Sequence, residues 1–143
     1  MKSIVNRRSV DTRHDVDMID ISNQVLEAVA DSGVIDGVVY VTTMHTTTGV
    51  TVNEGLPDVE DDLRDLLTRL APEIGDYRHQ RFLPSDGQMA VNSSSHQRSL
   101  LTGMQVCFPI EQGHLVRGSR QTIYFVEFDG PLHRDYVIHI IGS

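Results

Sequence analysis

The sequence predicts one domain, residues 1–143, of the α+β class with a mixed sheet. Two observations lead to this prediction. The length suits a single domain, and about seven short strand patterns surround a few helical ones without the regular alternation typical of α/β proteins. An apolar content of 39% with 22% charged residues is that of a globular chain.

The first elements begin near residue 20. Asp20 is a candidate cap for a helix that ends at Ser32-Gly33, and its apolar stripe consists of Ile21, Val25, Leu26 and Val29. The β-branched run 37–44 then predicts a strand buried on both faces. A second strand, 49–54, follows the polar turn His45-Thr46-Thr47-Thr48.

A second helix is expected from Pro57-Asp58 to Pro72, with Asp58 as its cap. Its leucines at 63, 66, 67 and 70 would face inward, and most of its acidic residues outward. The segment 73–89 has no period and contains Gly75, Pro84 and Gly87, which predicts a long ordered loop. Loops of this length often hold an active site.

The third helix fits 93–102, with Asn92 as N-cap and Gly103 as its end. The rest of the chain predicts strands at 104–110, 121–128 and 135–141. Cys107 lies in the first of these strands and is expected to be buried. Alternation in 121–128 indicates an antiparallel strand with one buried face.

Composition narrows the function classes. Twelve Lys+Arg against twenty Asp+Glu give a net charge of −8, which argues against nucleic-acid and anionic-membrane partners. There is one cysteine, no apolar run long enough to span a membrane and no secretory signal pattern. The expected partner is a small molecule, and the expected compartment is the cytoplasm.

Three histidines stand at suggestive places. His45 follows a predicted buried strand, His79 lies in the predicted long loop, and His96 lies on the third helix one turn after Asn92. Three neutral imidazoles suit a divalent metal such as zinc and leave a position for water or substrate. The alternative is that each is an ordinary surface or hydrogen-bonded histidine.

Carboxylates and anion-binding groups form two further sets of candidates. Glu54, at the end of a strand, could act as general base or orient a histidine. An anion could meet the helix start at Asn92 and Ser94, the hydroxyls of Thr46 and Thr47, and the guanidinium of Arg134. A purely structural reading of the serines as helix caps stays open, because no nucleotide-binding glycine motif is present.

Several ordered segments together resemble the YjbQ-like family, whose members are catalogued as secondary thiamine-phosphate synthases. The resemblance runs from about residue 18 to the C-terminus. The matching pieces are His45-Thr46-Thr47-Thr48-Gly49 with Glu54, Asp58-Val59 with Asp62-Leu63, Tyr77-Arg78-His79, Asn92 and His96 before Leu100-Leu101-Thr102-Gly103, Gly113-His114-Leu115, Gly118, Gln121, and Glu127-Phe128-Asp129-Gly130-Pro131 with Arg134.

The resemblance implies a two-layer fold with a mainly antiparallel sheet, assembled as a homotrimer. It also implies a site where His45, His79 and His96 converge, often on a metal such as zinc or magnesium. The implied activity is weak thiamine-phosphate synthesis, which joins a pyrimidine pyrophosphate to a thiazole phosphate. The chain departs from the family pattern at Ser94, at Arg120 and at Leu132, where a histidine, an aromatic residue and an arginine are usual.

Three hypotheses follow. The first is a metal-assisted enzyme for a small phosphorylated metabolite, in which His45, His79 and His96 hold the metal. Glu54, His96 and Asn92 would be catalytic, and Thr46, Thr47, Ser94 and Arg134 would bind the ligand. The second is a metal- or phosphometabolite-binding protein without turnover. The third is a structural or interaction protein.

Overall fold

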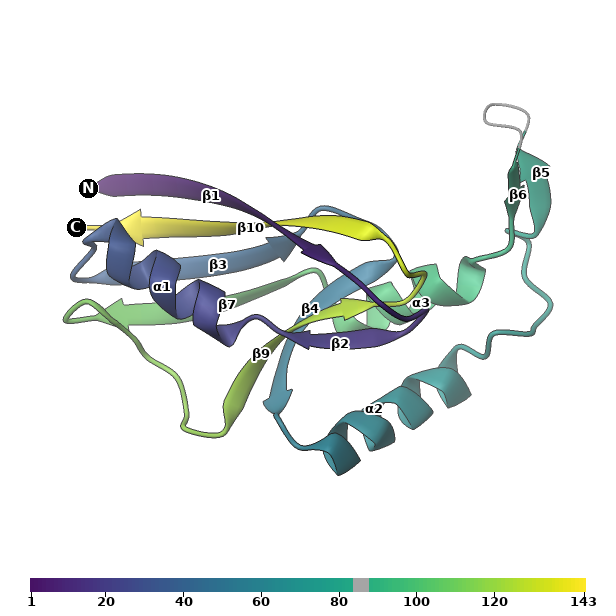
Figure 1. Cartoon of the computed structure of the whole chain (residues 1–143). Coiled ribbons are helices and arrows are strands. Elements are labelled where there is room, and N and C mark those ends of the chain that lie inside the picture. Colours follow the sequence, from purple (N-terminus) through teal and green to yellow (C-terminus); the bar gives the residue numbers. More distant parts are fainter. Residues whose placement is uncertain (84–87) are drawn as a thin grey trace.

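A computed structural model describes residues 1–83 and 88–143, with the side chains of 81–83 and 88–90 left aside. The chain forms an elongated α+β domain (Figure 1). The helices are α1 (Ser22–Ser32), α2 (Pro57–Leu70) and α3 (Ser93–Thr102). The strands are β1 (Lys2–Asp11), β2 (Asp17–Asp20), β3 (Gly37–Thr43), β4 (Thr48–Glu54), β5 (Arg81–Leu83), β6 (Gln88–Ala90), β7 (Gln105–Glu111), β8 (His114–Leu115), β9 (Gln121–Glu127) and β10 (His133–Gly142).

The strands form a five-stranded sheet in the order β1-β10-β3-β7-β8 and a three-stranded sheet in the order β2-β9-β4. Strands β5 and β6 make a separate hairpin. Each pairing between the described strands is antiparallel. The predicted α+β class and mainly antiparallel sheet are therefore confirmed. The expected mixed sheet is not found, because the described strands include no parallel pair.

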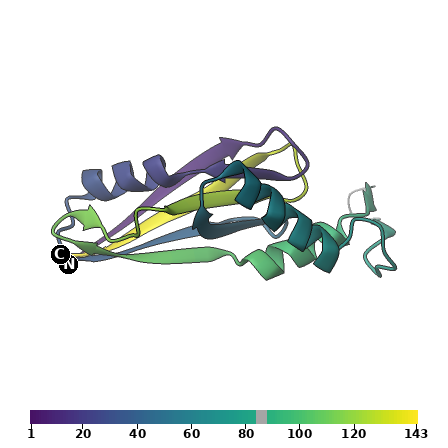
Figure 2. The ribbon, with the colours of Figure 1, turned by 90° about the horizontal axis from the view of Figure 1, so that it is seen from below.

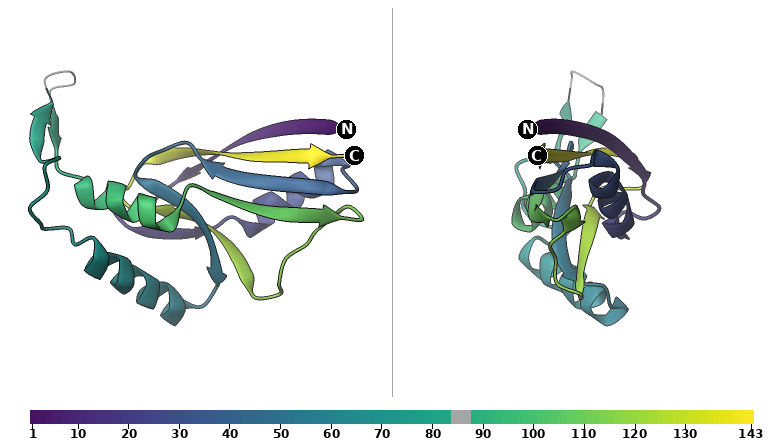
Figure 3. Two further views of the ribbon diagram at one scale, coloured as in Figure 1. Left: turned by 180° about the vertical axis from the view of Figure 1, so that it is seen from behind. Right: turned by 90° about the vertical axis from the view of Figure 1, so that its left-hand side faces the viewer.

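The main core lies between the two sheets and α1, which contacts β8, β9 and β10. The strands contribute the inward residues of a period-two pattern, among them Val39, Val41, Phe125, Ile138 and Ile140, all buried, and α1 contributes Val25, Ala28 and Val29. In the views from below and from behind, α1 lies toward the chain termini while α2 and α3 lie at the opposite end of the molecule (Figures 2 and 3).

Strand β9 is buried on both faces, which corrects the half-buried strand predicted at 121–128. Ile123 and Phe125 join the main core, while Tyr124, Val126 and Phe128 form a second cluster that contacts Leu67 of α2. Conversely, β3 is fully buried on one face only, because the residues between its core positions are only partly covered in the single chain.

Three other predictions of burial or capping are wrong. Cys107 is exposed, since Phe108 and Ile110 occupy the inward positions of β7. Leu66 and Leu70 remain 42% and 59% exposed, because α2 lies against the body along one narrow side and has no fully buried residue. Asp58 lies in the first turn of α2 and binds the N–H of Val59; it does not cap the helix.

Some strands of the structure lie outside the elements predicted from the sequence. Strands β1 and β2 precede the first predicted helix, and their many polar residues hid a period-two pattern. The predicted loop 73–89 contains the β5–β6 hairpin, while residues 84–87, with Pro84 and Gly87, lie outside the described part. Asp20 accepts the N–H of Ser22, although Ile21 holds the N-cap position of α1.

Candidate functional site

Helix α3 is fastened across the ends of two strands by its serines. The Ser95 hydroxyl donates to the carbonyl oxygen of Phe128, and the Ser99 hydroxyl donates to that of Thr48, both at 2.6 Å. Gly49 permits this approach, because a Cβ there would lie 2.6 Å from Cγ2 of Thr102. The turn 44–47 and the residues after β9 are thereby brought beside α3.

His45 occupies the turn between β3 and β4, where its imidazole is fixed by the backbone. Its Nε2 accepts the N–H of Asp135 at 2.9 Å, so Nδ1 carries the proton of the neutral ring. Burial lowers the pKa of His45 below its usual value, and the positive charge of Arg134 lowers it further. The backbone therefore holds the His45 ring in place, and the surroundings favour its neutral form.

One ring nitrogen of His96, Nε2, has no hydrogen-bond partner among the described residues. Its Nδ1 lies 3.1 Å from the carbonyl oxygen of Thr46, which can only accept, so Nδ1 donates and Nε2 keeps its lone pair. The ring of His79 lies edge-on to that of His96, with centroids 5.4 Å apart and planes at 74°. Two of the three predicted histidines thus meet directly.

A hollow of about 610 Å³ lies beside His45 and His96, and we call it the histidine pocket. Thr46 lines its polar side, while Met44, Leu100 and Met104 supply an apolar wall. The pocket combines an apolar surface with a few converging polar groups, as small-molecule sites usually do. His79 does not line the pocket, but its ring contacts that of His96, which does.

The predicted three-histidine metal site fits this arrangement only in part. Two imidazoles that bind one zinc ion through bonds of about 2.0–2.1 Å have ring centres about 5 Å apart, close to the spacing of His79 and His96. The Nε2 of His45 is already occupied by a backbone N–H. Among the described residues, no group of three or more His, Cys, Asp or Glu side chains is placed to share an ion.

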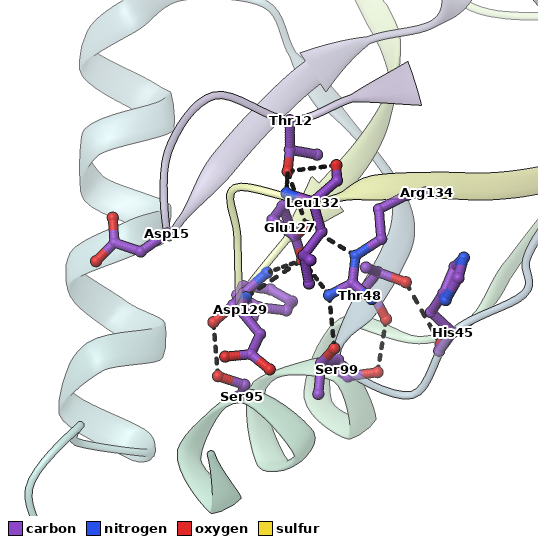
Figure 4. A network of polar contacts seen from close by, with 12 residues as sticks. Thr12, Asp15, His45, Thr48, Ser95, Ser99, Glu127, Asp129, Leu132 and Arg134 are labelled. Atoms are coloured by element: carbon purple, nitrogen blue, oxygen red, sulfur yellow. Dashed lines mark hydrogen bonds and ion pairs between the residues drawn. The ribbon is translucent and has the colours of Figure 1, made fainter. Parts of the chain in front are cut away.

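A closed polar cluster, which we call the Glu127 cluster, lies behind the turn that carries His45 (Figure 4). Glu127 is fully buried and pairs with Arg134, whose Nε and Nη2 donate to its two oxygens at 2.8 and 2.7 Å. Thr12 donates to the same carboxylate at 2.9 Å, and Arg134 also donates to Thr47 at 2.8 Å. Backbone N–H groups of residues 128 and 129 complete the shell.

This cluster changes the expected roles of two predicted ligand-binding residues. Arg134 is only 7% exposed, and its guanidinium is neutralised by Glu127. Thr47 is also buried and accepts from Arg134. Both position the 44–47 turn from behind, so neither presents a free group to the histidine pocket.

The other predicted residues lie elsewhere. Glu54 is at the far end of β4, opposite Gln121, where it pairs with the exposed Arg120 at 2.9 Å. Its seven-residue strand separates it from the His45 turn by about 20 Å. Asn92 holds the N-cap position of α3 but makes no capping bond; its amide donates to Asp129 at 2.7 Å. Ser94 is buried on the same side of α3.

Glu127, Thr12 and Arg98 are polar residues that the sequence reasoning did not select. Glu127 ends a strongly apolar strand, and a carboxylate at such a position needs a buried cation. That pattern could have pointed to Arg134 as its partner. Thr12 offered no such signal, because its contact spans more than a hundred residues of sequence.

The chain is a small α+β protein with a histidine-bearing turn beside α3. Proteins of this class form a known sequence family. The family model described as "UPF0047 protein YjbQ-like" matches residues 6–143. The chain belongs to this YjbQ/UPF0047 family, as its sequence motifs predicted.

Relatives of known sequence and structure cover almost the whole domain. The UPF0047 protein YugU of Bacillus subtilis is 35% identical over 127 residues, which is 88% of this chain and 90% of that protein. A UPF0047 protein of Archaeoglobus fulgidus is 36% identical over 123 residues, covering 86% and 90% respectively.

Two solved structures show the same fold. A YjbQ/UPF0047 family protein from Clostridium acetobutylicum is 41% identical, with a TM-score of 0.84 over 95% of this chain and 99% of that one. A YbjQ-like protein from Sulfolobus solfataricus is 26% identical, with a TM-score of 0.91 over 99% of both chains. Within the described residues, no helix is both long and apolar enough to cross a membrane.

Proposed function

We propose that the chain is an enzyme that acts on a small phosphorylated metabolite in the histidine pocket, with His96 as the proton-transfer group. The observation that carries the proposal is the free Nε2 of His96. Because Nδ1 is held by the Thr46 carbonyl, the ring has one tautomer and one orientation. An imidazole positioned in this way can act as a general acid or base.

The proposed enzyme binds a divalent ion through His79 and His96 only. Their spacing suits a shared ion, and imidazole favours zinc over magnesium. Such an ion would neutralise negative charge on a phosphate group. The exposed hydroxyl of Thr46, next to the His96 contact, would donate to the same group.

The family resemblance supplies the first reaction to test, which is thiamine-phosphate synthesis from a pyrimidine pyrophosphate and a thiazole phosphate. The wider proposal is a reaction in which a phosphorylated group leaves or is transferred. We also propose a cytoplasmic protein that assembles as a homotrimer. The trimer is supported by the exposed apolar side chains of Met44, Leu100 and Met104, which line the histidine pocket and would be covered by another copy of the chain. Light scattering after gel filtration tests the trimer.

The test of His96 uses the replacement His96→Gln with His114→Gln as its matched control. His114 is an exposed histidine on β8, remote from the pocket. Loss of a general acid or base lowers kcat by about 100-fold or more. We expect that loss in His96→Gln and an unchanged rate in His114→Gln, both with a wild-type circular dichroism spectrum. An undiminished rate in a folded His96→Gln enzyme would reject His96 as the proton-transfer group.

A second candidate function, binding of a phosphorylated metabolite without turnover, rests on a different observation. No carboxylate is among the described residues that line the histidine pocket, and Glu54 lies far from it. Calorimetric titration with inorganic phosphate and the two thiamine precursors, followed by product analysis, separates the functions. Saturable binding with no product over prolonged incubation supports binding alone, whereas any product that depends on His96 supports the enzyme.

A further inference from the structure

A second hollow lies on the other side of α3, between α3 and α2. Its wide part, of about 700 Å³, is lined by Arg64 of α2, Asn92 and Arg98 of α3, and Asp129 after β9. A narrower part of about 170 Å³ continues under α2 and shares Val16, Arg64 and Phe128 with the wide part. We call the two parts together the α2–α3 cavity. It shares no lining residue with the histidine pocket.

The narrow part is mostly apolar and has the size of one aromatic ring. Its walls include Met18, Leu63, Leu67, Leu101 and Val126. An apolar cavity of about 150 Å³ in another protein stays dry and takes up benzene, so 170 Å³ is enough for a six-membered ring.

Two buried polar atoms without partners belong to residues that line this narrow part. They are Nε of Arg64 and the hydroxyl oxygen of Thr102, which are the buried side-chain atoms lacking a hydrogen bond among the described residues. They come from different helices, α2 and α3. Buried polar groups are nearly always hydrogen-bonded. Both atoms are covered by the chain itself, so a small rotation of either side chain would bring its donor to a ligand atom in the cavity. A ring that carries one acceptor atom meets that requirement.

The wide part contributes an unpaired positive charge. Arg98 is 6% exposed, and its Nε donates to the carbonyl oxygen of Ala71 at 2.9 Å. Arg98 is in none of the ion pairs found among the described residues. A buried guanidinium of this kind is normally paired with an acid, and no acid of the described chain fills that role.

The charge of the same wall limits which acid can bind. Asp15, Glu73 and Asp129 also line the wide part, and Asp129 is held by the amide of Asn92. Three carboxylates near one free guanidinium repel a phosphate, which carries nearly two negative charges, more strongly than a carboxylate with one. Among anions, the wall therefore disfavours a phosphate relative to a ligand with a single negative charge.

We propose that the α2–α3 cavity binds a small aromatic carboxylate, with its ring under α2 and its acid group toward Arg98. A ring acceptor atom would take the N–H of Arg64 or the hydroxyl proton of Thr102. The site is independent of the histidine pocket and of the function proposed there. It would also give a role to the space that α2 leaves open beside Leu63 and Leu67, although Leu67 contacts the β9 cluster.

The test measures binding of two matched probes to the full chain by calorimetry at neutral pH. Isonicotinate carries a carboxylate and a ring nitrogen, and benzoate has the same shape without the ring acceptor. We expect saturable isonicotinate binding with a Kd below about 10 mM, which a ligand of this size reaches readily. Benzoate should bind about 5-fold more weakly, as the loss of one hydrogen bond predicts.

Two variants of α2 show where the probes bind. Leu67→Phe fills the narrow part and should abolish saturable binding, whereas Leu70→Phe, on the same helix but outside the cavity lining, should leave it unchanged. Arg98→Met should weaken both probes by about 10-fold or more. His96→Gln should bind both as the wild type does, which separates this site from the histidine pocket.

Three results would overturn the proposal. They are no saturable isonicotinate binding to the folded wild-type chain, equal affinities for isonicotinate and benzoate, and undiminished binding to a folded Leu67→Phe variant. The last result would also show that the probe binds another surface, such as one formed between copies of the chain.

Discussion

Two groups of buried polar residues flank the end of β9: the Glu127 cluster and the polar residues of the α2–α3 cavity. They differ in how many of their side-chain donors and acceptors have a partner. In the Glu127 cluster, the buried carboxylate accepts from Arg134, Thr12 and two backbone N–H groups. In the α2–α3 cavity, Arg64 Nε and the Thr102 hydroxyl have no partner among the described residues, and Arg98 has no counter-ion there. The first group is closed within the chain, and the second is open.

The difference separates scaffold from binding site more clearly than residue type does. Both groups contain a buried arginine, and both lie within a few residues of motifs that resemble the family. A buried charge whose hydrogen bonds are complete holds two segments together, here the turn at Thr47 and strand β10. A buried polar atom whose bonds are incomplete indicates that something else completes them.

The largest expected effect is loss of the cation in the closed cluster. Arg134→Met leaves the fully buried Glu127 without its counter-ion and should lower the free energy of unfolding by about 3–5 kcal/mol. Urea denaturation measures this change. The double variant Glu127→Leu with Arg134→Met should lose less than the sum of its single variants, because both charges leave together. A loss below about 1 kcal/mol for Arg134→Met would mean that the pair is not the scaffold described here.

An intermediate effect distinguishes a paired hydroxyl from an unpaired one. The Thr48 hydroxyl is buried and lies 2.5 Å from that of Thr43, so Thr48→Val should cost about 1–3 kcal/mol. Thr102→Val removes a buried hydroxyl that has no partner among the described residues, so it should cost no stability and should raise the free energy of unfolding by up to about 1–3 kcal/mol. The same urea titration measures both variants. Equal losses would contradict the distinction between closed and open groups.

The smallest effect is a pH dependence from His45. Its pKa in the folded chain is lowered by burial and by Arg134, so the unfolded chain binds more protons below about pH 6.5. The histidine therefore destabilises the fold as the pH falls through that value. His45→Gln keeps an acceptor for the Asp135 N–H but does not titrate.

The measurement is the difference in unfolding free energy between wild type and His45→Gln, taken from neutral to mildly acidic pH. That difference should move in favour of the variant as the pH falls, whatever the other histidines contribute to both proteins. A difference that stays constant with pH would show that the His45 ring is not held neutral by its surroundings.

Local sequence patterns predicted most of the fold. The errors of that prediction concern features that depend on tertiary packing. The helix at 93–102 agrees with α3 because its limits are marked by Asn92 and Gly103. The exposure of Leu66 and Leu70 could not be predicted, because an amphipathic stripe does not reveal how closely the helix approaches its neighbour. The N-terminal strand β1 was missed because polar residues at an edge strand weaken the apolar alternation.

The candidate site was predictable where chain neighbours became spatial neighbours. His45 and Thr46 lie in one turn, and His96 reaches them because α3 is fastened across β4. Glu54 was placed near them on sequence proximity, but a strand carries its two ends apart in space. Arg98 gave no signal at all, because its isolation becomes visible only once the positions of all acidic residues are known.

The loose packing of α2 affects which part of the molecule unfolds locally first. It has no fully buried residue, while α3 is tied to two strands through Ser95 and Ser99. Segments with few buried contacts separate from the body at lower free energy than the core does. Backbone amides of α2 should therefore exchange with deuterium well before those of β9, and a ligand seated beneath α2 should slow that exchange selectively.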